Sequence, residues 1–186
     1  MPAPATQPFS LILHPAVSEP ALESITGHVA RTTDGVLSLN YVLKGELDRL
    51  RLPARREPAF VDMLWRHTCC EAFIRRKDAA AYHEFNFSPS GEWAVYAFAR
   101  QRQRAPLDGD AGRFDPHVTV CRSDGKLELD AVIRLDRLSL APHARLVVGL
   151  SAVVEDTNGV LSYWALRHPL DHPDFHHPDA FALELA

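Results

Sequence analysis

Two carboxylate residues, Glu71 and Glu84, lie in neighbouring apolar segments of a chain of 186 residues. Paired carboxyl groups can serve as the acid and base of glycoside hydrolysis, and they can also hydrogen-bond the hydroxyl groups of a bound sugar. Adjacent strands also place carboxylates side by side without any chemistry. We therefore assign no catalytic residues. A binding role is our first hypothesis, and a sugar-active enzyme that uses this pair of carboxylates is an alternative.

Aromatic residues accompany these carboxylates in strand-like segments. Indole rings present a flat apolar face on which a sugar ring can stack, and amide, carboxylate and guanidinium groups hydrogen-bond hydroxyls. A polar stripe on an apolar sheet is costly unless it is wet or paired. The sequence thus predicts a non-catalytic face that binds a carbohydrate or a similar small polar ligand, with the candidate contacts Trp93, Trp164, Glu71, Glu84, Asn86 and Arg167. Trp65 and Tyr96 are further aromatic candidates.

Histidine and aspartate are dense near the C-terminus, at His168, Asp171, His172, Asp174, His176, His177 and Asp179. These residue types ligate transition metals, but Pro169, Pro173 and Pro178 exclude the helical spacing that would bring such ligands together. We expect a stiff loop leading into a last strand at residues 181–185, and no metal site.

Composition and motifs exclude several classes of function. The formal charge of −4 and a pI near 6.2 argue against nucleic-acid binding, and we interpret the arginine clusters at 49–56 and 100–104 as solvated loops. Residues 88–91 (SPSG) lack the Gly-x-Ser-x-Gly motif of a nucleophile elbow. The three cysteines fit neither a disulfide framework nor a zinc motif. No stretch is long enough to span a membrane, so a cytoplasmic location is expected.

Short apolar runs joined at hairpin dipeptides dominate the chain. Asp34-Gly35, Asp124-Gly125 and Asn158-Gly159 provide the positive φ that tight hairpins need. Period-two alternation is clearest at residues 127–135 and indicates a strand with one buried face. These patterns predict about eleven short strands, at 9–13, 26–33, 36–44, 69–75, 82–87, 93–99, 117–121, 126–135, 146–155, 160–167 and 181–185. We predict one all-β domain over residues 1–186, a two-layer antiparallel β-sandwich. Single helical turns are expected at 78–81 and 138–143, and a long loop at 101–114.

The segments WRHTCCEAF (65–73) and YHEFNFSPSGEW (82–93) resemble the DOMON-like family, which is similar in fold to family 9 carbohydrate-binding modules. The segments YWALRHP (163–169) and PDFHHP (173–178) resemble the closing part of bacterial members. The resemblance implies a jelly-roll-like sandwich whose concave sheet receives a sugar or a haem. It also implies that the histidine-rich stretch is structural.

A cofactor is not expected, with haem as the alternative. Cytochrome-type relatives use a methionine and a histidine as axial ligands, and Met63 with His168 is the conceivable pair here. The resemblance therefore leaves two ligand classes open, a small-molecule or glycan ligand and a haem. Neither nucleic acid nor a membrane is an expected partner.

Overall fold

A computed structural model describes residues 6–17, 19–138, 140 and 143–185 of the chain. Five short 3₁₀-helices interrupt the described strands: η1 (Leu47–Arg49), η2 (Leu64–Arg66), η3 (Ala111–Arg113), η4 (Leu135–Leu138) and η5 (Pro178–Ala180). The strands are β1 (Thr6–Leu13), β2 (Leu22–Arg31), β3 (Val36–Gly45), β4 (Cys69–Arg76), β5 (Tyr82–Phe87), β6 (Trp93–Arg100), β7 (Gln103–Ala105), β8 (His117–Ser123), β9 (Lys126–Arg134), β10 (Leu146–Glu155), β11 (Leu161–Ala165) and β12 (Leu183–Leu185). No helix within these ranges is long and apolar enough to cross a membrane.

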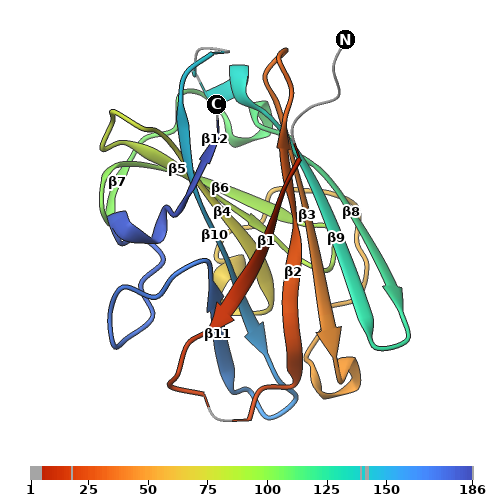
Figure 1. Ribbon diagram of the computed structural model, residues 1–186. Helices are drawn as coiled ribbons and strands as arrows, with labels where there is room; N and C mark the ends of the chain where they lie inside the picture. Colours follow the sequence, from red (N-terminus) through yellow and green to blue (C-terminus); the bar gives the residue numbers. More distant parts are fainter. Residues whose placement is uncertain (1–5, 18, 139, 141–142, 186) are drawn as a thin grey trace.

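The strands form two antiparallel layers that β1 connects (Figure 1). Sheet A has the order β8-β9-β3-β2 and ends on the first part of β1, where Leu11 pairs with Ile25. Sheet B has the order β7-β6-β5-β4-β10-β11 and ends on the last part of β1, where Leu13 pairs with Trp164. The predicted all-β, two-layer antiparallel sandwich is confirmed.

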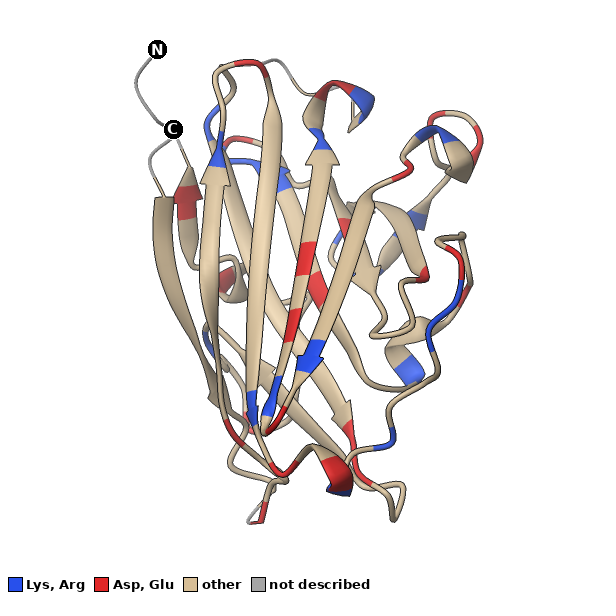
Figure 2. Ribbon diagram, turned by 90° about the vertical axis from the view of Figure 1, so that its right-hand side faces the viewer, with Lys and Arg blue, Asp and Glu red and all other residues tan. Residues whose placement is uncertain are grey.

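Alternating side chains from both sheets fill the core between the layers. Leu127, Leu129, Ala131 and Ile133 of β9 point inward and are buried, as their spacing predicts. Sheet B contributes alternate residues in the same way, among them Cys70, Ala72 and Ile74 of β4 and Phe85 and Phe87 of β5. Figure 2 shows Lys, Arg, Asp and Glu gathered mainly in loops and at strand ends, where their charges stay solvated.

The three predicted hairpin dipeptides all lie at turns. Gly35, Gly125 and Gly159 have φ values of 81°, 62° and 83°, a conformation that glycine adopts without steric cost. They close the β2–β3, β8–β9 and β10–β11 hairpins respectively, so each dipeptide marks a pair of neighbouring strands.

Some of the predictions for the segments that connect the strands were wrong. Strand β7 lies inside the expected 101–114 loop, where Ala97 and Phe98 of β6 give it a partner that composition does not reveal. Residues 78–81 form a turn and bend without a helix. The helical turn expected at 138–143 falls partly on residues 139, 141 and 142, which lie outside the described residues.

The segment between β11 and β12 packs against the outer face of sheet B. Strands β11 and β12 pair with opposite ends of β10, at Ser151–Glu155 and Leu146–Val148, so the segment that connects them must leave the sheet between these points. That segment, residues 166–182, contributes Phe175 and Phe181 to a second apolar cluster with Phe73, Tyr82, Tyr96 and Phe98. Strand β10 is consequently buried on both faces along its whole length. We call residues 166–182 the C-terminal loop.

Candidate functional site

The two carboxylates singled out in the sequence lie together on the outer face of sheet B. Because neighbouring side chains of β4 point to opposite faces, Cys70 and Ala72 enter the core while Glu71 points outward. Glu71 is paired in register with Asn86 of β5 and Ser151 of β10, and Glu84 lies two residues from Asn86 along β5. Glu71 and Glu84 are only 2% and 5% exposed. They form the floor of a cavity.

Hydrogen bonds orient both carboxyl groups. Oε2 of Glu71 accepts a hydrogen bond from Oγ of Ser151 at 3.2 Å, and its Oε1 accepts one from Sγ of Cys69 at 3.5 Å. Nδ2 of Asn86 donates to Oε1 of Glu84 at 2.8 Å. Asn86 itself is fully buried and lies beside Glu84 on the same face of β5, so it helps to position that carboxyl.

Burial makes these carboxyls weaker acids than usual. Burial and, as a smaller cause, the charge of Glu84 together raise the pKa of Glu71 to about 8. The pKa of Glu84 is also raised by burial, although the hydrogen bond from Asn86 and the charge of Arg104 oppose the rise. At neutral pH the Glu71 carboxyl is therefore protonated and can donate a hydrogen bond.

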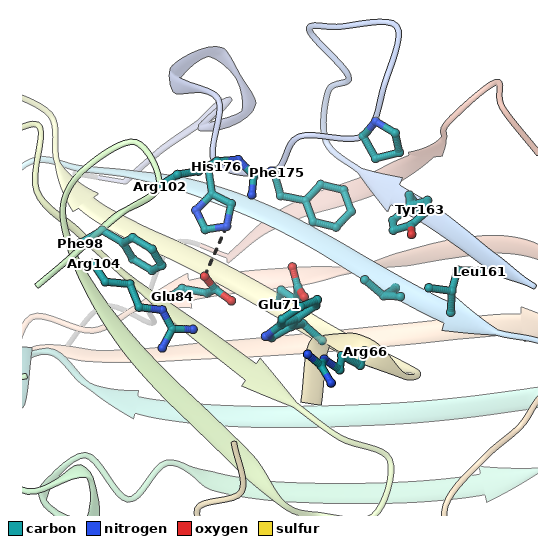
Figure 3. A pocket seen from close by; sticks show the side chains of 13 residues that line it. Arg66, Glu71, Glu84, Phe98, Arg102, Arg104, Leu161, Tyr163, Phe175 and His176 are labelled. Carbon is teal, nitrogen blue, oxygen red and sulfur yellow. Dashed lines mark ion pairs between the residues drawn. The ribbon is translucent and has the colours of Figure 1, made fainter. Parts of the chain in front are cut away.

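The cavity above these carboxyls has a volume of about 440 Å³. That size suits a small ligand. Figure 3 shows Glu71 and Glu84 in its centre, with side chains from the strands, η2 and the C-terminal loop around them. The lining consists of Trp65, Arg66, Glu71, Glu84, Phe98, Arg102, Arg104, Val153, Leu161, Tyr163, Pro173, Phe175 and His176. Aromatic rings on several sides and polar groups on the floor make the site amphipathic.

A tight turn presents Trp65 at the cavity. Met63 precedes η2 in the left-handed conformation, with a φ of 62°. The hydroxyl of Tyr96 fixes this turn, because it donates to Oδ1 of Asp62 at 2.6 Å and accepts from the Met63 backbone N–H at 2.9 Å. The Trp65 side chain remains 40% exposed and is free to contact a ligand.

His176 places the C-terminal loop against the floor. Nδ1 of His176 lies 2.7 Å from the Tyr82 hydroxyl, which also accepts the Arg102 backbone N–H at 3.2 Å. In the neutral tautomer in which Tyr82 donates to Nδ1, the imidazole proton is on Nε2, which lies 3.6 Å from Oε2 of Glu84. Burial lowers the pKa of His176 to about 4, and the charge of Arg102 adds to the effect. The imidazole is thus neutral at physiological pH.

Asp174 fixes the same loop from the β6–β7 side. Its Oδ1 forms an ion pair with Arg102 at 2.8 Å, and its Oδ2 accepts from Nε2 of Gln101 at 3.0 Å. Oδ1 also accepts the backbone N–H of His176 at 3.1 Å. The loop and the β6–β7 hairpin are therefore held as one wall of the cavity.

Four of the six predicted ligand contacts are absent from the lining of this cavity, and one of them, Asn86, is fully buried and bonds Glu84. The structure corrects the expectation for Trp93 and Trp164: their exposures are 2% and 4%, and both indoles pack in the core between the sheets. The alternation of β6 and β11 directs them inward, which strand patterning alone could not specify. Arg167 is exposed at the start of the C-terminal loop and lies outside the cavity lining.

The residues proposed for haem ligation do not suit that role. Met63 lines a neighbouring cavity that His168 does not share. Nε2 of His168 donates to the Ile12 carbonyl at 2.7 Å, so this nitrogen is already engaged. Among the described residues, no group of three or more His, Cys, Asp or Glu side chains is arranged to hold a metal ion.

Several lining residues were not predicted as contacts. Arg102 and Arg104 belong to the cluster interpreted as a solvated loop, and His176 to the stretch interpreted as structural. Pairing of β7 with β6 and the fold of the C-terminal loop bring them to the site. Arginines grouped near an aromatic strand were the available signal.

Comparison with known proteins supports the fold. No protein-family model matches this sequence, and no curated protein is significantly similar to it. Among solved structures, the chain is similar to a "putative carbohydrate-binding protein" from Bacteroides uniformis, with a TM-score of 0.65 and 15% sequence identity. The match covers 95% of this chain and 83% of that one. At this identity the likeness shows a shared β-sandwich architecture.

Proposed function

We propose that the chain is a non-catalytic binding module whose cavity on the outer face of sheet B takes a small carbohydrate-type ligand. The observation that carries the proposal is the buried carboxyl pair, Glu71 and Glu84, on the floor of an aromatic-walled cavity of about 440 Å³. The Bacteroides uniformis structure and the resemblance to DOMON-like domains point the same way.

The chemistry of the floor matches hydroxyl groups. A sugar hydroxyl both donates and accepts, so it is best served by a site that offers both functions. Glu71, protonated at neutral pH, can donate from its carboxyl, and Glu84 can accept. Because water is largely excluded from such a floor, leaving these groups unmatched disfavours apolar ligands.

The walls supply the apolar contact. Trp65, Tyr163 and Phe175 present aromatic rings from η2, β11 and the C-terminal loop. Aromatic rings add dispersion and stacking energy against the C–H faces of a sugar ring. Trp65 replaces Trp93 and Trp164 as the stacking residue, because it combines exposure with a place in the cavity.

A panel of mono- and disaccharides, read by thermal shift and then by isothermal titration calorimetry, tests this function. Trp65→Ala should weaken binding about tenfold or more. Phe60→Ala is the matched control, since Phe60 is also 40% exposed but lies outside this cavity, and it should bind normally. A panel that is silent, or equal losses in both variants, would overturn the proposal.

A second candidate is a sugar-active enzyme with Glu71 as its acid. The raised pKa of Glu71 beside a second carboxyl with different partners favours this reading. Turnover of nitrophenyl glycosides by the wild type, abolished in Glu71→Gln and in Glu84→Gln, would establish it. Sugar binding without turnover supports the binding module.

A further inference from the structure

The cavity contains cationic groups that the protein itself leaves unmatched. Of the three arginines in the lining, Arg102 forms an ion pair with Asp174 at 2.8 Å. Across the described residues, Arg66 and Arg104 have no carboxylate within ion-pairing distance and no side-chain hydrogen bond. Two guanidinium groups therefore remain available at the site.

Aromatic rings hold these two guanidinium groups in place. The Arg104 guanidinium carbon lies 4.0 Å from the centroid of the Tyr96 ring, and that of Arg66 lies 5.4 Å from the Trp65 ring. Stacking orients the guanidinium plane but uses none of its N–H donors. Both groups are thus positioned for a fork of hydrogen bonds to a planar or tetrahedral anion.

The charges around the cavity do not cancel. Asp174 balances Arg102, and Glu71 and His176 are both neutral at pH 7 because burial has moved their pKa values to about 8 and about 4. Among the residues that line this cavity, Glu84 is then the one carboxylate left to balance Arg66 and Arg104. The cavity carries an excess of positive charge although the whole chain has a formal charge of −4.

Figure 3 shows how the two kinds of group divide the cavity. Arg66 and Arg104 lie on one side of the Glu71 and Glu84 carboxyls, and His176 and Phe175 lie on the other. A ligand that spans this arrangement needs an anionic group at one edge and hydroxyls over the centre.

We propose that the ligand is an acidic sugar whose carboxylate or phosphate group binds Arg66 and Arg104 while its hydroxyls meet Glu71 and Glu84. This inference rests on the proposed function and adds the charge class of the ligand. A neutral sugar would leave both guanidinium groups without an anionic partner.

Calorimetry with matched sugars tests the charge class. D-glucuronate and D-galacturonate are compared with D-glucose and D-galactose, and glucose 6-phosphate forms a separate arm that distinguishes phosphate from carboxylate. The wild type should bind one acidic form about tenfold more tightly than its neutral parent, since charge-assisted hydrogen bonds to guanidinium are the stronger kind. Arg104→Gln and Arg66→Gln should each remove most of this preference, because each lowers the affinity for the acidic form much more than the affinity for its neutral parent.

Arg100→Gln provides the charge-matched control. Arg100 is the last residue of β6, the first strand of the β6–β7 hairpin, and it lies outside the cavity lining. It should keep the preference. Equal affinity for acidic and neutral sugars, or a preference that survives in Arg104→Gln and Arg66→Gln, would overturn the acidic-sugar inference and leave the binding function intact. Failure of every sugar to bind the wild type would instead overturn the proposed function, and this inference with it.

Discussion

Oε2 of Glu84 lies 3.6 Å from Nε2 of His176, which joins the middle of sheet B to the C-terminal loop at the floor of the cavity. The imidazole is neutral at physiological pH, because burial and the nearby arginines lower its pKa. The contact is therefore one between a carboxyl group and a neutral imidazole N–H, and it depends on the orientation that Tyr82 gives the ring. The loop and the floor form one site through this contact.

Removal of His176 should loosen that loop. His176→Ala deletes the contacts with Glu84 and Tyr82, so we expect ligand affinity to fall about tenfold and stability to fall by about 1–2 kcal/mol. His172→Ala, in the same loop but exposed and in contact with Asp171, should change neither. Calorimetry and urea denaturation measure both quantities. Unchanged binding in His176→Ala would show that the loop does not support the site.

The raised pKa of Glu71 makes stability depend on pH. The folded state keeps this proton up to about pH 8, whereas an unfolded carboxyl releases it near its ordinary pKa of 4.5, so Glu71 lowers stability progressively as pH rises between these values. Glu71→Gln should remove this loss. The free energy of unfolding of the variant minus that of the wild type should therefore rise by up to about 5 kcal/mol between pH 5 and pH 8.5. Denaturation curves from pH 5 to 9 test this.

Glu184→Gln is the control for that series. Glu184 pairs with Lys77 on the surface, and its side chain is 60% exposed. A small and pH-independent change over the same range is expected from this variant. Parallel pH profiles for the wild type and Glu71→Gln would contradict the protonated state assigned to Glu71.

The two tryptophans Trp164 and Trp65 should separate stability from binding. Trp164→Ala removes a ring that is 4% exposed in the core, so it should cost about 3–5 kcal/mol. Trp65→Ala removes a 40% exposed ring and should cost less than about 1 kcal/mol while weakening ligand binding. Chemical denaturation beside calorimetry distinguishes the two effects. A large loss of stability in Trp65→Ala would place that ring in the core.

Gly27 tests the packing of sheet A. A Cβ at this position would lie 1.8 Å from the Asn40 carbonyl oxygen on the neighbouring strand, a backbone atom that cannot move aside freely. Gly27→Ala should therefore cost at least about 2 kcal/mol or abolish folding. Gly149→Ala, whose nearest contact would be 3.3 Å, should be milder. Similar melting temperatures for both variants would contradict the register of β2 and β3.

Much of the fold was readable in the sequence, and less of the site was. Hairpin dipeptides such as Asp34-Gly35 and the alternation of Leu127 to Ile133 depend on local geometry, so they predicted strands and turns that the structure contains. Alternation does not say which face meets the second sheet. For this reason the sequence could not show that Glu71 and Glu84 line the outer cavity while Trp93 and Trp164 point into the core.

The remaining site residues depend on contacts between distant segments. Arg104 reaches the cavity because β7 pairs with β6, and His176 does so because the C-terminal loop crosses sheet B. Neither event leaves a periodic pattern in the sequence. Proline-rich and arginine-rich segments predicted loops, but only the three-dimensional packing shows which loops line a cavity.

Mapping a bound sugar on the protein tests the central claim most directly. In a titration of ¹⁵N-labelled protein with the tightest-binding sugar, the largest amide shifts should occur at Trp65, Glu71, Glu84, Arg104 and His176. Amides on the solvent side of sheet A, such as those of Glu128 and Asp130 of β9, should stay unchanged. Shifts that gather on sheet A, or that leave Glu71 and Glu84 unaffected at saturation, would contradict a ligand site on the outer face of sheet B.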